Sequence, residues 1–285
     1  MSILLAALFL LASPQSGVDR ITVAAADADV AGLSKAMTPK VTFRRNEASA
    51  TRAPWVDSNG WRYLRQPDGH FYCDAPDATA ADLAAAEAFA YDVSVKIRAG
   101  AAASESLAKM LAFLRTVKGG DYSPLVNIGF VDDGSAESGE FMNLLVRRNL
   151  LFKVVKQPAP RVDLNVVPGS DQYPKAESAN PSLLAEKVRA NLTDAKRLLR
   201  LYGSEVVVGR LVGHGGDARL YLLNYGAARS PAHGVRIRVL GAFSKQEATQ
   251  FDSPETKLID VAVGSGATEF TLPELKTFAI FDLAK

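Results

Sequence analysis

The chain has 285 residues, of which 48% are hydrophobic and 22% are charged, and its formal net charge is +2. This composition is that of a folded globular protein, and it excludes a disordered chain, a collagen-like repeat and a polytopic membrane protein. The nearly balanced charge creates no general field that would attract nucleic acid or anionic lipid, so nucleic acid is not an expected partner.

The first clear pattern is an uncharged apolar run at residues 3–12, ILLAALFLLA. A helix needs about 20 residues to cross a bilayer, so no stable membrane span is expected, and the run matches the apolar region of a secretory signal peptide. We therefore expect a signal peptide over residues 1–17, or as far as 26, and a secreted or periplasmic protein. Two features do not fit a signal peptide: Pro14 is badly placed for cleavage after Ser13, and no Lys or Arg precedes the run. The alternative interpretation is a buried N-terminal strand or helix.

Residues 18–53 are rich in Ala, Asp and Thr and have weak periodicity, so we expect a poorly ordered lead-in with a strand near 41–43. A small α/β segment is expected over 54–120. Alternation and helical spacing predict its elements as strands at 61–64 and 93–97 and helices at 80–91 and about 107–117.

The middle of the chain has the clearest pattern. The continuous apolar run LVNIGFV at 125–131 is typical of a strand buried on both faces of a parallel sheet. The expected elements that follow are a helix at 137–148, strands at 150–155 and 162–167, and a long helix from Asn180 and Pro181 to Gly203. A strand, a helix and a strand in this order form a right-handed βαβ unit, so we predict an α/β domain over 121–205.

Short predicted strands separated by Gly, Pro, Asp and Ser turns fill the rest of the chain, at 206–212, 219–224, 235–240, 258–263, 269–272 and 277–283. This spacing is typical of a β-sandwich over 206–285. The sequence GHGG at 213–216 leads into a strand and is therefore expected to be a hairpin turn instead of a nucleotide-binding loop. The predicted fold class is α/β, with a parallel-sheet βαβ portion followed by a C-terminal all-β sandwich.

Cysteine and histidine are too sparse for a metal centre. Cys73 is the single cysteine, which excludes an intramolecular disulfide and a cysteine-based zinc site. The three histidines lie far apart, at positions 70, 214 and 233, and no P-loop is present. We therefore expect no metal and no cofactor.

Two aspartates follow the predicted strand at 125–131. Asp132 and Asp133 lie just beyond its carboxyl end, which is where ligands bind to open α/β sheets. They are candidate catalytic or cation-binding residues. We favour the alternative, in which Asp132 caps the next helix and Asp133 faces solvent.

The sequence PWVDSNGWRY at 54–63 contains both tryptophans of the chain. Flat aromatic rings beside amide and carboxylate groups suit the faces and hydroxyls of a sugar, so the candidate sugar-binding residues are Trp55, Asp57, Asn59, Trp61 and Arg62. Asp57 is also a candidate catalytic acid, although no partner carboxylate can be placed from the sequence. A tryptophan-anchored tight turn is the alternative interpretation.

The run from 126 to 167, with NIGFVDDGSAESGEFMNLLVRRNLLFKVV as its centre, resembles the flavodoxin-like, amidotransferase-like domain of bacterial β-galactosidase-type glycoside hydrolases. The segments RLYLLNY (219–225), LPEL (272–275) and FAIF (278–281) look like the small β-sandwich that closes such enzymes. The resemblance covers about half of the chain. It implies that the flavodoxin-like domain, at 121–205, is structural or mediates oligomerisation, and that it lacks the amidotransferase cysteine.

The sequence departs from that family before the middle domain. A (β/α)8 barrel takes about 250 residues, and only 54–120 precede the flavodoxin-like region, so the two catalytic glutamates of the family cannot be assigned here. We therefore expect an exported carbohydrate-associated accessory or binding module with a carbohydrate ligand. The alternatives are a glycosidase-like hydrolase that uses Asp57 with Asp132 or Asp133, and a structural protein that forms a homo-oligomer and binds no ligand.

Overall fold

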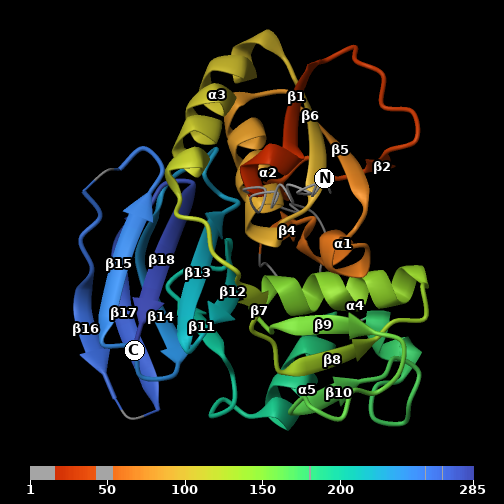
Figure 1. Ribbon diagram of the computed structural model, residues 1–285. Helices are drawn as coiled ribbons and strands as arrows, with labels where there is room; N and C mark the ends of the chain where they lie inside the picture. Colours follow the sequence, from red (N-terminus) through yellow and green to blue (C-terminus); the bar gives the residue numbers. More distant parts are fainter. Residues whose placement is uncertain (1–16, 43–53, 180, 254, 265) are drawn as a thin grey trace, which may run out of the picture.

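The computed structural model describes residues 17–42, 54–179, 181–253, 255–264 and 266–285. Three parts pack together (Figure 1): an N-terminal part from residue 17 to 116, a middle part from 128 to 192, and a C-terminal part from 199 to 284. The apolar run at 3–12 lies outside the described residues. No described helix has the length and apolar character needed to span a membrane.

The N-terminal part is built on a four-stranded parallel sheet in the order β1-β6-β5-β2. Its strands are β1 (Ile21–Ala25), β2 (Ser34–Lys35), β5 (His70–Ala75) and β6 (Ser94–Ala99). The helices α2 (Ala78–Tyr91) and α3 (Ala101–Thr116) pack against each other and against this sheet. Alternate residues of β5 and β6 are buried, among them Cys73 and Ile97, while the residues between them are partly exposed.

Two expectations for this part are wrong. Residues 61–64 belong to helix α1 (Gly60–Arg65), because the Asn59 carbonyl accepts the amides of Arg62 and Tyr63 at 2.8 and 3.0 Å and so begins a helical turn. The poorly ordered lead-in expected over 18–53 is wrong for residues 18–42, since β1 pairs with β6 along its whole length, and residues 43–53 lie outside the described part of the chain. Only Ile21 of β1 is buried, which explains the weak periodicity. Signal cleavage within 24–26 would cut this strand.

A short antiparallel pair, β3 (Lys40–Thr42) and β4 (Trp55–Asp57), precedes α1. A short 3-10 helix, Gly17–Arg20, precedes β1. Helix α2 begins two residues earlier than expected, because the Asp77 side chain accepts a hydrogen bond from the Ala80 amide at 2.9 Å and caps the helix.

The middle part contains a three-stranded parallel sheet in the order β10-β8-β9. Its elements are β8 (Ile128–Val131), α4 (Ala136–Arg147), β9 (Phe152–Val155), β10 (Leu164–Val166), the 3-10 helix Lys175–Ala179 and α5 (Pro181–Leu192). Ile128 and Phe130 are fully buried. Gly129, on the opposite face, lies so close to the Asn165 side chain that a Cβ there would be 2.5 Å from it. The strand is therefore covered on both faces, as its continuous apolar run predicts.

The long helix expected after Asn180 is only partly correct. Helix α5 ends at Leu192, because Thr193 adopts a left-handed conformation with φ 65°. Leu199 falls within the range expected to be helical, seven residues after Leu192, but lies on strand β11 (Leu199–Tyr202). A spacing of seven residues fits two turns of helix, so these leucines alone could not reveal the break.

The C-terminal part consists of two antiparallel sheets, in the orders β11-β14-β17-β16 and β15-β18-β13-β12-β7. The remaining strands are β7 (Ser123–Pro124), β12 (Val207–His214), β13 (Asp217–Asn224), β14 (Ala232–Leu240), β15 (Lys245–Gln250), β16 (Ile259–Val263), β17 (Ala267–Leu275) and β18 (Phe278–Ala284). Both sheets contribute to one buried cluster, in which the rings of Phe270 and Phe281 lie 5.3 Å apart. The hairpin expected at 213–216 is confirmed, since β12 and β13 pair across it and Gly215 and Gly216 have positive φ.

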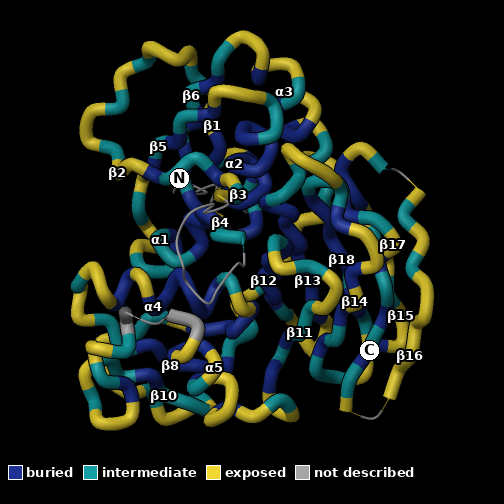
Figure 2. The backbone as a smooth tube through the Cα atoms, turned by 180° about the vertical axis from the view of Figure 1, so that it is seen from behind, coloured by how far each residue is buried: buried dark blue, intermediate teal, exposed yellow. Residues whose placement is uncertain are grey.

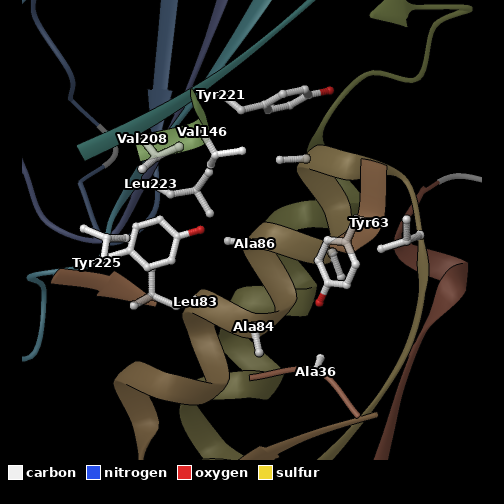
Figure 3. Close-up of a cluster of buried hydrophobic side chains, with 14 of the residues drawn as sticks. Ala36, Tyr63, Leu83, Ala84, Ala86, Val146, Val208, Tyr221, Leu223 and Tyr225 are labelled. Carbon is white, nitrogen blue, oxygen red and sulfur yellow. The ribbon is translucent and has the colours of Figure 1, made fainter. Parts of the chain in front are cut away.

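The three parts meet around α2. Figure 3 shows Leu83, Ala84 and Ala86 of this helix, with Val146 of α4 and the C-terminal residues Val208, Leu223 and Tyr225 on its flank. Buried residues continue through these junctions, whereas outer loops and strand β16 are exposed (Figure 2). The chain is therefore a mixed α/β protein with parallel and antiparallel sheets, which confirms the predicted fold class at that level.

Candidate functional site

Trp55 lies at the start of β4, on the boundary between the N-terminal and middle parts. Its ring is partly buried, and the Arg147 guanidinium lies over it, with the Arg147 Cζ 4.1 Å from the ring centroid. The same guanidinium donates a hydrogen bond from Nη2 to the Pro54 carbonyl at 3.1 Å. The end of α4 therefore holds Trp55 in place while its aromatic surface stays partly accessible.

Trp61 lies on α1 and packs against α4. A Cβ at Gly139 would be 2.9 Å from two ring atoms of Trp61, so the ring rests directly on the helix backbone. The guanidinium groups of Arg62 and Arg65 lie 4.3 and 5.3 Å from the ring centroid. Because these contacts join α1 to α4, Trp61 has a structural role whatever else it binds.

Asn59 is fully buried, and both ends of its amide are hydrogen-bonded within the protein. Its Oδ1 accepts the Met37 amide at 2.7 Å, and its Nδ2 donates to the Met37 carbonyl at 2.9 Å and to Glu87 Oε2 at 2.8 Å. The expectation that Asn59 contacts a sugar does not fit this placement. The residue fixes the turn between β4 and α1.

Asp57 and Arg62 are both partly or largely buried. The Asp57 residue is 8% exposed, and its Oδ2 accepts a hydrogen bond from Thr42 Oγ1 at 3.1 Å. Trp55 and Asp57 are two residues apart on one strand and therefore share a face. Burial lowers the pKa of Arg62, whose Nε is buried and has no hydrogen-bond partner among the residues that the structure describes.

Asp132 and Asp133 occupy the loop after β8, as expected, and both have cationic partners. Asp132 Oδ1 accepts from Arg65 Nη2 at 2.7 Å. Asp133 Oδ2 accepts from Lys175 Nζ at 2.7 Å, and its Oδ1 accepts from the hydroxyls of Ser135 and Ser138 at 2.6 and 2.7 Å. Led by the Lys175 bond, these contacts hold the pKa of Asp133 well below its usual range.

Asp133 is therefore ionised at neutral pH and is not a proton donor. The helix that follows is capped by Ser135, whose hydroxyl accepts the Ser138 amide at 3.2 Å, so the expectation that Asp132 caps it is wrong. Asp132 instead joins α1 to the middle part through Arg65. Among the described residues, no group of three or more His, Cys, Asp or Glu is placed to hold a metal ion.

Sequence reasoning missed Glu87, which lies fully buried on α2. Its carboxylate accepts hydrogen bonds from Ser58 Oγ at 2.9 Å, from the Asn59 amide at 2.7 Å, and from the Tyr225 hydroxyl. Burial raises the pKa of Glu87, and the hydrogen bonds oppose that shift. The available signal was position, since Glu87 follows Leu83 by one helical turn and so lies on the same buried face.

Cys73, the single cysteine of the chain, is buried on β5. Burial raises the pKa of its thiol to about 12, so the reactive thiolate is absent at neutral pH. Cys73 therefore acts as a small core residue.

Two pockets lie at the junctions between the parts. One, of about 510 Å³, is formed by Pro54, the end of α4, α5 and the segment after β11. The other, of about 240 Å³, lies beyond the carboxyl end of β5 between Pro76, Asp77 and Tyr225. Pro54, the residue before Trp55, lines the larger pocket. This pocket therefore lies beside the first of the predicted sugar-binding residues.

No protein-family model and no curated protein sequence matches this chain. Among solved structures, its fold is similar to α-L-fucosidase isoenzyme 2 from Paenibacillus thiaminolyticus, with a TM-score of 0.60 at 9% identity. That match covers 79% of this chain and 62% of the fucosidase, so the chain spans less than two thirds of its neighbour.

Two further glycoside hydrolases have lower similarity. The β-galactosidase from Bacillus circulans sp. alkalophilus has a TM-score of 0.44 at 9% identity, over 88% of this chain and 55% of that one. The GH42 exo-carrageenase from Bacteroides ovatus has a TM-score of 0.41 at 7% identity, over 87% and 47%. The structural neighbours are thus glycoside hydrolases at low sequence identity, and the likeness to the fucosidase is one of fold.

Proposed function

We propose that this chain is an exported carbohydrate-binding accessory protein of the glycoside hydrolase lineage that lacks a complete catalytic barrel. The observation that carries the proposal is the fold shared with the fucosidase. Within the described residues, the parallel sheet of the N-terminal part has four strands, against the eight of a (β/α)8 barrel. Export rests on the apolar run at 3–12.

The finer relationship to β-galactosidase-type enzymes is part of the proposal. In it, 54–120 is a reduced α/β segment extended by β1 and β2, 121–205 is a flavodoxin-like domain, and 206–285 is a closing β-sandwich. The support comes from the three parallel strands of the middle part, and from the two antiparallel sheets that share one buried cluster.

The proposed sugar-contacting surface centres on Trp55. Its partly buried ring offers an apolar face for stacking, and Asp57 follows on the same side of β4. Trp61 and Arg62 extend this surface across α1. Asn59 supports it from beneath by fixing the turn between the two elements.

Calorimetric titration of the full chain against oligosaccharides selected on a glycan array tests this assignment. We expect Trp55→Ala to weaken binding by about tenfold or more, which corresponds to about 1.4 kcal/mol. A matched control is Tyr72→Ala, because Tyr72 also stacks with an arginine, Arg98, at 4.9 Å, but on the sheet of the N-terminal part. Unchanged affinity in a folded Trp55→Ala variant, or a selective loss in Tyr72→Ala, would overturn the assignment.

The alternative hydrolase would need Asp57 to work with Asp132 or Asp133. Both loop aspartates are already engaged by cations, Asp132 by Arg65 and Asp133 by Lys175. The Lys175 contact also lowers the pKa of Asp133, which disfavours Asp133 as a proton donor. Turnover of a chromogenic glycoside that disappears in Asp57→Asn would reverse this preference. Homo-oligomerisation stays a prediction, which light scattering would test.

A further inference from the structure

The pocket of about 510 Å³ lies where the end of α4, helix α5 and the segment after β11 meet. Pro54 forms part of its wall, so the pocket begins beside the proposed sugar-contacting residue Trp55. The volume is within the range of about 300–1,000 Å³ that is usual for small-ligand sites.

The charged side chains around this pocket are mostly cationic. Four arginines and two glutamates contribute to its lining: Arg147, Arg148, Arg189, Arg197, Glu186 and Glu205. A lining with this excess of positive charge favours an anionic ligand over a neutral one.

The arginines differ in how far the protein already neutralises them. Arg189 and Arg197 share the carboxylate of Asp194, at 3.1 and 3.4 Å. Within the described part of the chain, neither Arg147 nor Arg148 has a carboxylate within 4.0 Å. These two adjacent cations at the end of α4 therefore lack a counter-ion in direct contact.

Arg147 is the more deeply placed of the two. Burial, together with the nearby charge of Arg148, lowers the pKa of Arg147 to about 10, whereas Asp57, Glu140 and Glu205 oppose the shift from beyond ion-pair distance. Arg147 therefore remains charged at neutral pH although it is largely removed from water. Among the described residues, the Arg147 side chain makes one hydrogen bond, to the Pro54 carbonyl, which leaves most of its five N–H donors available to a ligand.

A second unsatisfied group faces the same region. The side chain of Arg197 is 9% exposed, and its Nε is buried without a hydrogen-bond partner among the described residues. Removing a cation from water is costly unless it is paired, and guanidinium groups match the two oxygens of a carboxylate or sulfate.

On the basis of the carbohydrate-binding function above, we propose that this pocket binds the acidic group of a sugar, a carboxylate or a sulfate ester, while the sugar ring lies against Trp55. Arg147 and Arg148 supply the charge, and the Trp55–Arg147 contact places the aromatic ring beside it. The site therefore selects acidic over neutral saccharides.

Calorimetric titration of the full chain tests this with matched probes: trigalacturonate against its methyl ester, a sulfated disaccharide against its desulfated form, and inorganic sulfate alone. We expect an acidic sugar to bind at least tenfold more tightly than its neutral counterpart. We also expect its affinity to fall as salt rises, because the contact is electrostatic.

Arg148→Ala is the informative variant, because Arg148 is exposed and its side chain makes no ion pair among the described residues. This variant should weaken binding of the acidic probe by about tenfold and leave the affinity for the neutral probe unchanged. Arg115→Ala is the matched control, since Arg115 is also exposed at the end of a helix, α3. It should change neither affinity.

The outcomes separate the two proposals. Equal, Trp55-dependent binding of acidic and neutral probes would overturn the acidic-sugar site and leave the carbohydrate-binding function standing. Inorganic sulfate binding as tightly as the sulfated sugar would show an anion site without a sugar subsite, which also overturns the inference. Failure of every saccharide to bind would overturn both proposals.

Discussion

The Tyr225 hydroxyl donates a hydrogen bond to the buried carboxylate of Glu87, 138 residues earlier in the chain. Tyr225 follows β13 in the C-terminal part, and Glu87 lies on α2 of the N-terminal part. Ser58 and Asn59 bind the same carboxylate from the turn after β4. One acidic side chain therefore joins the C-terminal part, the helix at the centre of the molecule and the turn that carries the proposed site.

We expect Glu87→Ala to lower the free energy of unfolding by about 3–5 kcal/mol, because it leaves several buried donors without an acceptor. Tyr225→Phe removes one donor and should cost about 1–2 kcal/mol. Urea unfolding followed by circular dichroism measures both. Glu105→Ala on the exposed surface of α3 is the control and should leave stability without a measurable change. A Glu87→Ala variant as stable as the wild type would contradict the structural role of this network.

Asp82 lies on α2, the same helix as Glu87. Its environment predicts that the free energy of unfolding depends on pH. Burial raises its pKa from 3.8 to about 6, while the hydrogen bond from Ser106 Oγ at 2.6 Å opposes the shift. Because the folded pKa lies above the unfolded value, the folded state binds the proton more tightly between about pH 4 and 6. The contribution of Asp82 is therefore fully present below about pH 4 and is lost as the pH rises through 6.

Asp82→Asn should remove this dependence. We expect the difference in unfolding free energy between variant and wild type to change by about 1–2 kcal/mol between pH 4 and pH 7, after allowance for solvent screening. Urea titrations at four pH values measure it, and Asp77→Asn at the helix cap is a control for charge removal on α2. Parallel stability curves for wild type and Asp82→Asn would contradict the prediction.

The fold was predictable from the sequence where burial leaves a repeating pattern. Residues 128–131 (IGFV) contain no polar side chain because β8 is covered on both faces, and the strands of the C-terminal part are separated by turn residues. Strand β8 begins three residues later than the run at 125–131, because Asn127 lies before it and donates hydrogen bonds to Asp163 and to the Lys196 carbonyl. The pattern failed where a segment was short. Alternation over Trp61–Leu64 cannot be distinguished from one turn of helix, and strand β15 (KQEATQ) has no apolar face because it lies at a sheet edge.

The site was predictable only in part. The sequence between 54 and 63 predicts a sugar-binding surface from two tryptophans that are close in the chain, and the structure places each of them against helix α4, Trp55 at Arg147 and Trp61 at Gly139. The sequence could not indicate that Asn59 faces inward, since that depends on Met37 and Glu87 lying beside it. The arginine-lined pocket was missed because its residues come from α4, α5 and β11, and only tertiary packing brings these elements together.

The contact between Trp61 and Gly139 predicts an unusual effect of a small substitution. Alanine at a helical position is ordinarily more stable than glycine by about 1 kcal/mol, but a Cβ here would be 2.9 Å from the ring. We expect Gly139→Ala to lower stability by about 1–3 kcal/mol and to shift tryptophan fluorescence. Gly119→Ala is the control, because no atom lies within 4 Å of its Cβ position. A more stable Gly139→Ala variant would show that α1 can move away from α4 without cost.

Asn149 joins the middle and C-terminal parts through both its backbone and its side chain. It adopts a left-handed conformation with φ 54°, its Oδ1 accepts the Gly209 amide at 2.7 Å, and its Nδ2 donates to the Val207 carbonyl. Asn149→Gly keeps the backbone conformation and loses the hydrogen bonds, so it should cost about 1–3 kcal/mol. Asn149→Ala also strains the backbone and should cost about 1–2 kcal/mol more.

Urea unfolding of the two variants therefore separates the side-chain contribution from the backbone contribution. If the glycine variant matches the wild type and only the alanine variant is destabilised, backbone conformation alone explains the stability of this junction, and the hydrogen bonds of Asn149 to β12 contribute nothing measurable. If both lose stability in the expected order, the Asn149 amide holds β12 against the end of α4. Because Arg147 and Arg148 lie at that same end, the substitution should then also weaken ligand binding in the adjacent pocket.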